Sequence, residues 1–203
     1  LANDFRGGAF HPAAAAVLAA LVERLGARAT PVIGGAVSNA DARMVGAGFD
    51  AVGRAAAVLG DKAPFVAAAR ARMRDGDVDV AAAAVACFAA LVDDEDAFVE
   101  AILPVLELGG QRAVGAALKG VARFPSLRTL SLLEQRLMRG PSRLSLVALQ
   151  VLQDIGSDDV LPPLVGAISH RRQRVRTEAV RVLRVLAAQG HIDMARAIMF
   201  LLR

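Results

Sequence analysis

The chain has 203 residues and a formal net charge of +4, and apolar residues make up 55% of it, which excludes a disordered charged tail. Alanine occurs 43 times, and it is the best helix former and a poor strand former. The longest apolar run without a charge, residues 80–92, has 13 residues, whereas a membrane-spanning helix needs about 18 or more. The composition therefore favours an all-helical protein, and we expect no membrane partner.

A leading helix over His11–Leu25 is expected after a loose lead-in at residues 1–10. Clusters of Gly, Pro, Asp and Ser then divide the chain at intervals of 31 to 34 residues, and a second break falls inside each interval. Each interval is predicted to form a helix, a short turn and a second helix, with about 12 to 18 residues in each helix. The five predicted pairs lie near residues 27–60, 61–94, 95–125, 126–157 and 158–190, and a final helix is expected from Asp193.

Several polar residues mark where these helices begin. Thr30 precedes Pro31, which predicts an N-cap followed by proline in the first turn. Asp61, Ser126 and Asp158 stand at comparable starts. No linker or change of composition interrupts the pattern, so we predict one domain over residues 1–203 with partial repeats at both ends, and a chain that is a piece of a longer protein.

Apolar residues recur at fixed places in each interval, which is typical of a repeat architecture. In the second helix of each pair a small residue recurs: Ala51, Ala84, Ala117, Ala148 and Ala179. Apolar residues lie four positions before and after each alanine, which places all three on one face of a helix. In the first helices the recurring residues are Val32, Phe65, Phe98, Leu130, Leu161 and Met194. Such helices bury their faces only by stacking, so we predict an αα-solenoid of about five to six helix pairs.

The fifth pair resembles a HEAT repeat. Leu161-Pro162-Pro163-Leu164 matches the L-P-x-L pattern of the first helix of that family, and residues 175–183 match V-R-x-x-A-x-x-x-L in the second helix. The other pairs lack the arginine, with Gly48, Ala81, Val114 and Ser145 in its place. The resemblance implies a HEAT-like αα-superhelix and a scaffold for protein–protein interaction.

Charge is unevenly distributed along the sequence. Residues 75–107 contain nine acidic and no basic residues, whereas residues 166–203 contain eight basic and two acidic residues. The candidate partner-binding residues come from these two regions: Asp93, Asp94, Glu95 and Asp96, and Arg171, Arg172, Arg174, Arg181 and Arg184. For the acidic group we favour helix capping and a solvated face, with a docking patch as the alternative.

A helical projection of the last complete pair assigns roles to its arginines. At 100° per residue, Val175, Ala179, Val182, Leu183 and Leu186 form the core face, and Arg174, Arg181 and Arg184 lie opposite it. This arginine stripe is either a solvated charged face or a surface for an anionic partner. Arg176 lies at the edge of the core face, where we expect an ion pair or a hydrogen bond to a loop carbonyl.

Motifs that would indicate catalysis or ligand binding are incomplete. The G-x-G-x-x-A pattern at residues 46–51 lies inside a helical stripe, where we expect its glycines to allow close helix packing. The acidic run at residues 75–79 lacks the Gly and Glu of a calcium loop and is better explained as a helix cap. Cys87 is expected to be a buried, inert thiol, and the three histidines lack the spacing of a zinc site. We expect no enzyme activity, no metal and no cofactor.

Three functions remain open at this point. The first is a non-catalytic scaffold or adaptor that binds another protein through its second helices, as the resemblance implies. The second is binding of duplex nucleic acid, in which the arginine stripe contacts the phosphate backbone. The third is a regulatory or lyase-type HEAT partner of a cofactor-bearing protein. The alanine- and arginine-rich composition is typical of high-GC bacterial genomes, and we expect a cytoplasmic bacterial protein.

Overall fold

The computed structural model describes residues 11–193, and this part of the chain is all-helical, with eleven α-helices, two short 3₁₀ helices and no strand. Three predictions concern residues outside this range. The lead-in at residues 1–10 and the place of Met194 lie outside it, and the final helix from Asp193 runs beyond it. The chain divides into two compact units, Leu1–Ala117 and Leu118–Arg203.

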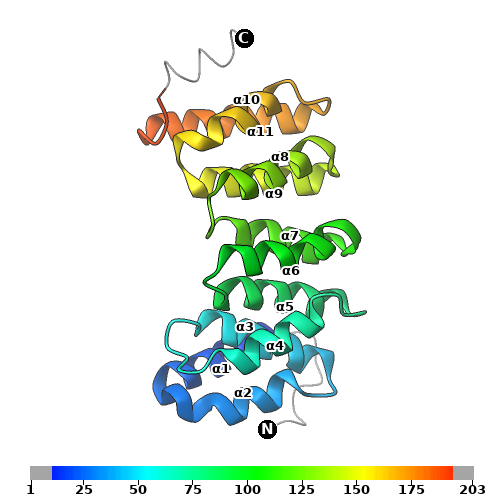
Figure 1. The fold of residues 1–203 in the computed structure, drawn as a ribbon, viewed down its shortest axis with the longest axis vertical. Coiled ribbons are helices and arrows are strands. Elements are labelled where there is room, and N and C mark those ends of the chain that lie inside the picture. The colour runs from blue at the N-terminus through cyan, green and yellow to red at the C-terminus, as the bar shows by residue number, and fades with distance from the viewer. Residues whose placement is uncertain (1–10, 194–203) are drawn as a thin grey trace. The chain divides into compact units, whose positions relative to one another are not determined.

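The first unit contains helices α1 to α6 and the start of α7 (Figure 1). Helix α3 packs between α1 and α5, α2 packs on α3, and α4 packs on α5. The elements of this unit are α1 (His11–Leu25), η1 (Gly26–Ala29), α2 (Thr30–Val37), α3 (Ala42–Arg54), α4 (Ala63–Arg72), α5 (Val78–Leu91), α6 (Glu95–Leu108) and the start of α7 (Gln111–Val121).

The second unit contains two helix pairs stacked on each other (Figure 1). Helix α8 packs on α9 and α10 packs on α11, while α9 contacts α11 and α8 contacts α10. The elements of this unit, after the end of α7, are α8 (Leu127–Arg139), α9 (Ser142–Ile155), η2 (Asp158–Val160), α10 (Leu161–Ile168) and α11 (Gln173–Ala188).

Side-chain caps fix several helix starts. Ser126 forms a capping box with Thr129 at the start of α8, as predicted for Ser126. Asp77 caps α5 by accepting from the backbone N–H groups of Asp79 and Val80, so the run at residues 75–79 is a cap, as expected. The N-cap predicted at Thr30 is wrong, because the 3₁₀ helix Gly26–Ala29 runs directly into α2 and Thr30 is already helical.

Four helices are shorter than the predicted 12 to 18 residues, among them α4 with ten residues and α7 with eleven. Helices α2 and α10 have eight residues each, because a 3₁₀ helix with tighter turns occupies the start of each predicted span. The place predicted for Val32 in the core is also wrong, since its neighbour Ile33 is fully buried and Val32 is 52% exposed.

The predicted alanine ladder forms the centre of the core. These five alanines are all fully buried: Ala51, Ala84, Ala117, Ala148 and Ala179. The predicted close approach of helices is seen at Gly48, where an added Cβ would lie 2.9 Å from Val37 Cγ1 and 3.0 Å from its backbone nitrogen. Small residues on the second helices therefore allow neighbouring helices to pack closely.

Candidate functional site

Helix α11 presents its residues as the helical projection predicted. Its core face is buried, comprising Val175, Ala179, Val182, Leu183 and Leu186. Arg174, Arg181 and Arg184 are exposed on the other side. The structure therefore confirms the sidedness of the arginine stripe, while the local partners of its members differ.

Two arginines at the start of α11 hold turns together. Arg176 Nη1 donates to the carbonyl oxygen of His170 at 2.9 Å and to that of Arg171 at 3.3 Å, which confirms the expected hydrogen bond to loop carbonyls. Arg172 Nη1 donates to the carbonyl oxygen of Gly140 at 2.6 Å, across to the α8–α9 turn. Arg172 is thus committed to packing the two pairs together, and it is a poor candidate for contacting a partner.

Arg181 is exposed, and its side chain also has hydrogen-bond partners within the chain. Its Nη2 donates to Glu178 Oε1 at 2.7 Å and to Gln153 Oε1 of α9 at 2.9 Å. The hydrogen bond to Arg181 lowers the pKa of Glu178, and nearby Arg174 adds to this effect, so Glu178 is ionised at neutral pH. The predicted stripe of Arg174, Arg181 and Arg184 is therefore exposed, and its middle residue forms a local ion pair with Glu178.

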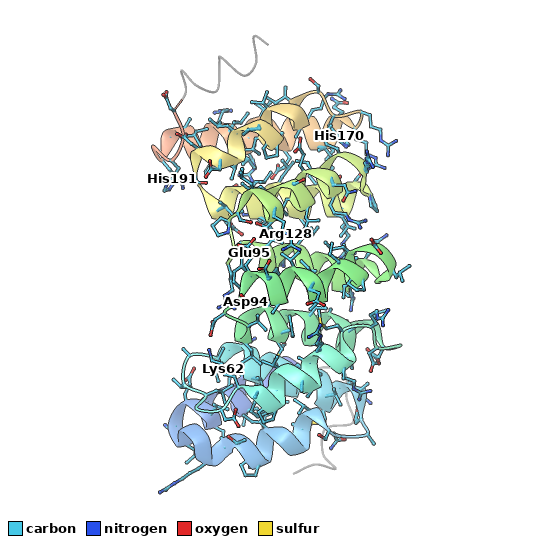
Figure 2. The ribbon with its side chains drawn as sticks, viewed as in Figure 1. Lys62, Asp94, Glu95, Arg128, His170 and His191 are labelled. Carbon is cyan, nitrogen blue, oxygen red and sulfur yellow. The ribbon has the colours of Figure 1, made fainter. Side chains whose placement is uncertain are left out.

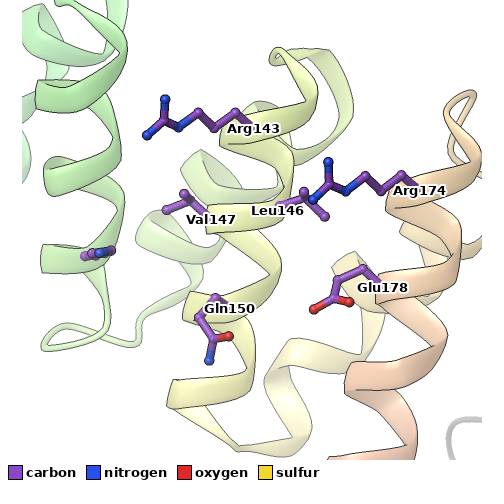
Figure 3. A pocket seen from close by; sticks show the side chains of 7 residues that line it. Arg143, Leu146, Val147, Gln150, Arg174 and Glu178 are labelled. Atoms are coloured by element: carbon purple, nitrogen blue, oxygen red, sulfur yellow. The ribbon is translucent and has the colours of Figure 1, made fainter.

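A surface groove of about 460 Å³ lies along these second helices. It is lined by one residue of α7, four of α9 and two of α11: Lys119, Arg143, Leu146, Val147, Gln150, Arg174 and Glu178. Figure 3 shows Leu146 of α9 extending toward α11, and Arg174 and Glu178 of α11 extending toward α9. All seven residues belong to the second unit.

The groove combines free cations with an apolar floor. Lys119, Arg143 and Arg174 are exposed, and among the described residues none of the three forms an ion pair. Leu146 and Val147 are half-buried between them. Arg143 and Arg174 are each the second residue of a helix, where the helix macrodipole does not stabilise a cation. Helix stability therefore gives no reason for their presence.

Sequence reasoning found only Arg174 among these groove residues. Arg143 precedes Leu144 in the apolar ladder as Arg174 precedes Val175, at a spacing of 31 residues. Applying the repeat register to the polar positions as well as to the apolar ones would have brought the two arginines together. Lys119 lies at the end of α7, and the spacing within α9 and α11 does not predict its place in the groove.

The predicted acidic group lies in the first unit, at the turn before α6. Asp94 is the N-cap of α6 and accepts from the backbone N–H of Ala97 at 2.7 Å. Asp93 accepts from Lys62 Nζ at 3.2 Å. Glu95 and Asp96 form the first turn of α6, where the macrodipole stabilises acids. The preferred interpretation of a cap is confirmed for Asp94.

The remaining candidates from the sequence are the thiol of Cys87 and the histidines. Burial, with a smaller contribution from Asp50, raises the pKa of the Cys87 thiol to about 12. His170 is buried, and its Nδ1 accepts from the backbone N–H of Arg172 at 3.1 Å. His170 and His191 lie at opposite ends of α11 (Figure 2).

Residues 11–193 contain no group of three or more His, Cys, Asp or Glu side chains placed to hold a metal ion. In the same part of the chain, no helix combines the length and the apolar character needed to cross a bilayer.

The sequence matches no protein-family model and no curated protein sequence.

Proposed function

We propose that this protein is a HEAT-like αα-solenoid that acts as a non-catalytic scaffold and binds another protein through the exposed face of α9 and α11. The observation that carries the proposal is the groove in which unpaired Lys119, Arg143 and Arg174 surround half-buried Leu146 and Val147. Protein-binding surfaces combine apolar contact with charges that select the partner. The burial of the alanine ladder supports the solenoid, because the same position of every second helix faces a core.

The HEAT-like assignment is supported by the fifth pair. Pro162 lies in the first turn of α10, and the motif arginine, Arg176, donates to two carbonyl oxygens of the α10–α11 turn. Arg176 therefore joins the turn to the second helix, which gives a structural reason for an arginine at this position of the repeat.

Affinity isolation from the source cells tests this proposal. The wild-type protein is compared with an Arg143→Glu/Arg174→Glu variant and with an Arg54→Glu/Arg70→Glu control, which changes the net charge equally at exposed positions outside the groove. We expect one protein to be recovered in stoichiometric amount with the wild type and the control, and lost with the groove variant. Equal recovery with all three proteins would contradict the proposal.

Duplex nucleic acid is the second candidate, because Arg139, Arg143, Arg171 and Arg174 all lie at or beside the two turns that Arg172 joins. Titration of a fluorescent duplex at about 50 and about 200 mM salt tests it, since phosphate contacts give an affinity that falls steeply with salt. Binding that is lost in the groove variant and falls linearly on a log–log plot against salt would favour this candidate over a protein partner.

A further inference from the structure

We propose that the groove on α9 and α11 takes a short acidic segment of a partner protein, in which carboxylates pair with Arg143 and Arg174 and an apolar side chain seats over Leu146 and Val147. This inference rests on the proposed function, and it specifies the chemistry of the partner.

The charge of Arg143 and Arg174 favours carboxylates on the partner. Arg143 and Arg174 come from neighbouring helices that pack on each other, and both are exposed and unpaired among the described residues. A guanidinium presents a planar set of donors that a carboxylate accepts in bidentate geometry. Because α9 and α11 pack on each other, the backbone positions of the two arginines are set before a partner arrives, and only their side chains have to be ordered on pairing.

The floor of the groove calls for an apolar side chain. Leu146 and Val147 are half-buried beside the arginines, and they still have surface that a partner can remove from water. The volume of about 460 Å³ accommodates a few side chains and is too small for a folded domain to enter. A segment that projects one or two apolar side chains between its acidic residues fits both the size and the chemistry.

The wall of the groove disfavours a nucleic-acid backbone. Glu178 lines it, and its hydrogen bond with Arg181 keeps this carboxylate ionised. A dense row of phosphates would be repelled by Glu178 and would leave the apolar floor uncovered. A peptide places its carboxylates at the arginines and an apolar group on the floor, so it needs no anionic group beside Glu178.

Fluorescence anisotropy with synthetic probes tests this inference directly. The probes are a peptide with two leucines between pairs of glutamates, the same peptide with serines in place of the leucines, and a duplex DNA. We expect the leucine peptide to bind the wild-type protein at least about tenfold more tightly than the serine peptide. We expect its affinity to fall at least about tenfold in the Arg143→Glu/Arg174→Glu variant and in Val147→Ser, and to change less than about threefold in the Arg54→Glu/Arg70→Glu control.

Other outcomes of the same titrations would overturn the inference. Equal affinity for the leucine and serine peptides would show that charge alone is read. Tighter binding of the duplex, lost in the groove variant, would assign the groove to nucleic acid. Absence of peptide binding, when the protein partner is still recovered in a groove-dependent manner from cells, would overturn the acidic-segment inference and leave the scaffold function in place. Far-ultraviolet circular dichroism and urea midpoints verify that each variant is folded. Arg143→Lys/Arg174→Lys keeps the charge and loses the bidentate geometry, so it should bind the peptide more weakly than the wild type and more tightly than the glutamate variant.

Discussion

Arg172 Nη1 donates a 2.6 Å hydrogen bond to the carbonyl oxygen of Gly140, which joins the turn before α11 to the turn before α9. Gly140 is buried, so this carbonyl oxygen would lack its guanidinium donor if the side chain were removed. The contact spans 32 residues of sequence and fixes one helix pair of the second unit against the next.

Removal of this guanidinium is expected to destabilise the second unit. Arg172→Ala should lower the free energy of unfolding by about 1–3 kcal/mol, the usual value for a hydrogen bond to a charged donor. Arg184→Ala, at an exposed position of the same helix, should change it by less than about 0.5 kcal/mol. Urea denaturation followed by circular dichroism measures both, and equal values for the two variants would refute the structural role of Arg172.

The close approach of α2 and α3 is expected to tolerate no side chain at Gly48. Its added Cβ would lie 2.9–3.1 Å from atoms of Val37 and Ala36, so Gly48→Val should cost about 1–3 kcal/mol by overpacking. Gly35, also helical, has nothing within 4 Å of its added Cβ, and Gly35→Ala should stabilise the protein by up to about 1 kcal/mol. Thermal unfolding of the two variants beside the wild type tests this contrast, which fails if both shift the midpoint in the same direction.

The capping box of α8 offers a separate test of local stability. Ser126 Oγ accepts from the backbone N–H of Thr129, and the Thr129 hydroxyl oxygen accepts from the backbone N–H of Ser126. Ser126→Ala should cost about 1 kcal/mol because it leaves an N-terminal donor without its side-chain partner. Ser131→Ala, on the exposed side of the same helix, is the matched control and should be close to neutral. An equal loss of stability in both variants would show that the capping box contributes nothing of its own.

The pKa of Cys87 predicts a loss of stability at high pH. The thiol has a pKa of about 12 in the folded protein and about 9 when unfolded, so the unfolded state loses its proton first. The contribution is therefore fully present below about pH 9 and decreases as the pH rises from about 9 to about 12, by at most about 1.4 kcal/mol per pH unit.

The composition makes this effect measurable. The chain has no tyrosine, and its only lysines are Lys62 and Lys119, so few other groups titrate in this range. Urea midpoints between pH 8 and pH 10.5 should fall for the wild type and stay flatter for Cys87→Ala. Parallel curves for the two proteins would contradict the assignment to Cys87.

Periodicity in the sequence predicted the helices and the core well. The bounds of α1, the alanine ladder and the buried face of α11 follow from apolar spacing, because burial of one helix face is a local property of the sequence. Periodicity does not report backbone geometry. It therefore missed the 3₁₀ helices that precede α2 and α10, and it placed Val32 in the core where Ile33 is the buried residue.

The site was less predictable than the core. The sequence identified the exposed arginines of α11, but the partners of Arg172 and Arg181 lie 32 and 28 residues away, on another helix or turn. The groove takes residues from two sides of α9, because Leu146 extends toward α11 whereas Arg143 and Val147 extend away from it (Figure 3). Such a surface depends on the packing of neighbouring helices, which the spacing within one helix leaves open.

A fluorescent probe in the groove tests the central claim most directly. Because Cys87 is buried with a raised pKa, a cysteine introduced by Gln150→Cys can be labelled selectively with an environment-sensitive dye. Addition of the leucine-containing acidic peptide should shift the emission of this dye to saturation at one peptide per protein. The same dye on Ser131→Cys, which is exposed on α8 outside the groove, should not respond. An equal response at both positions, or a response on α8 alone, would contradict the assignment of the α9–α11 groove as the binding surface.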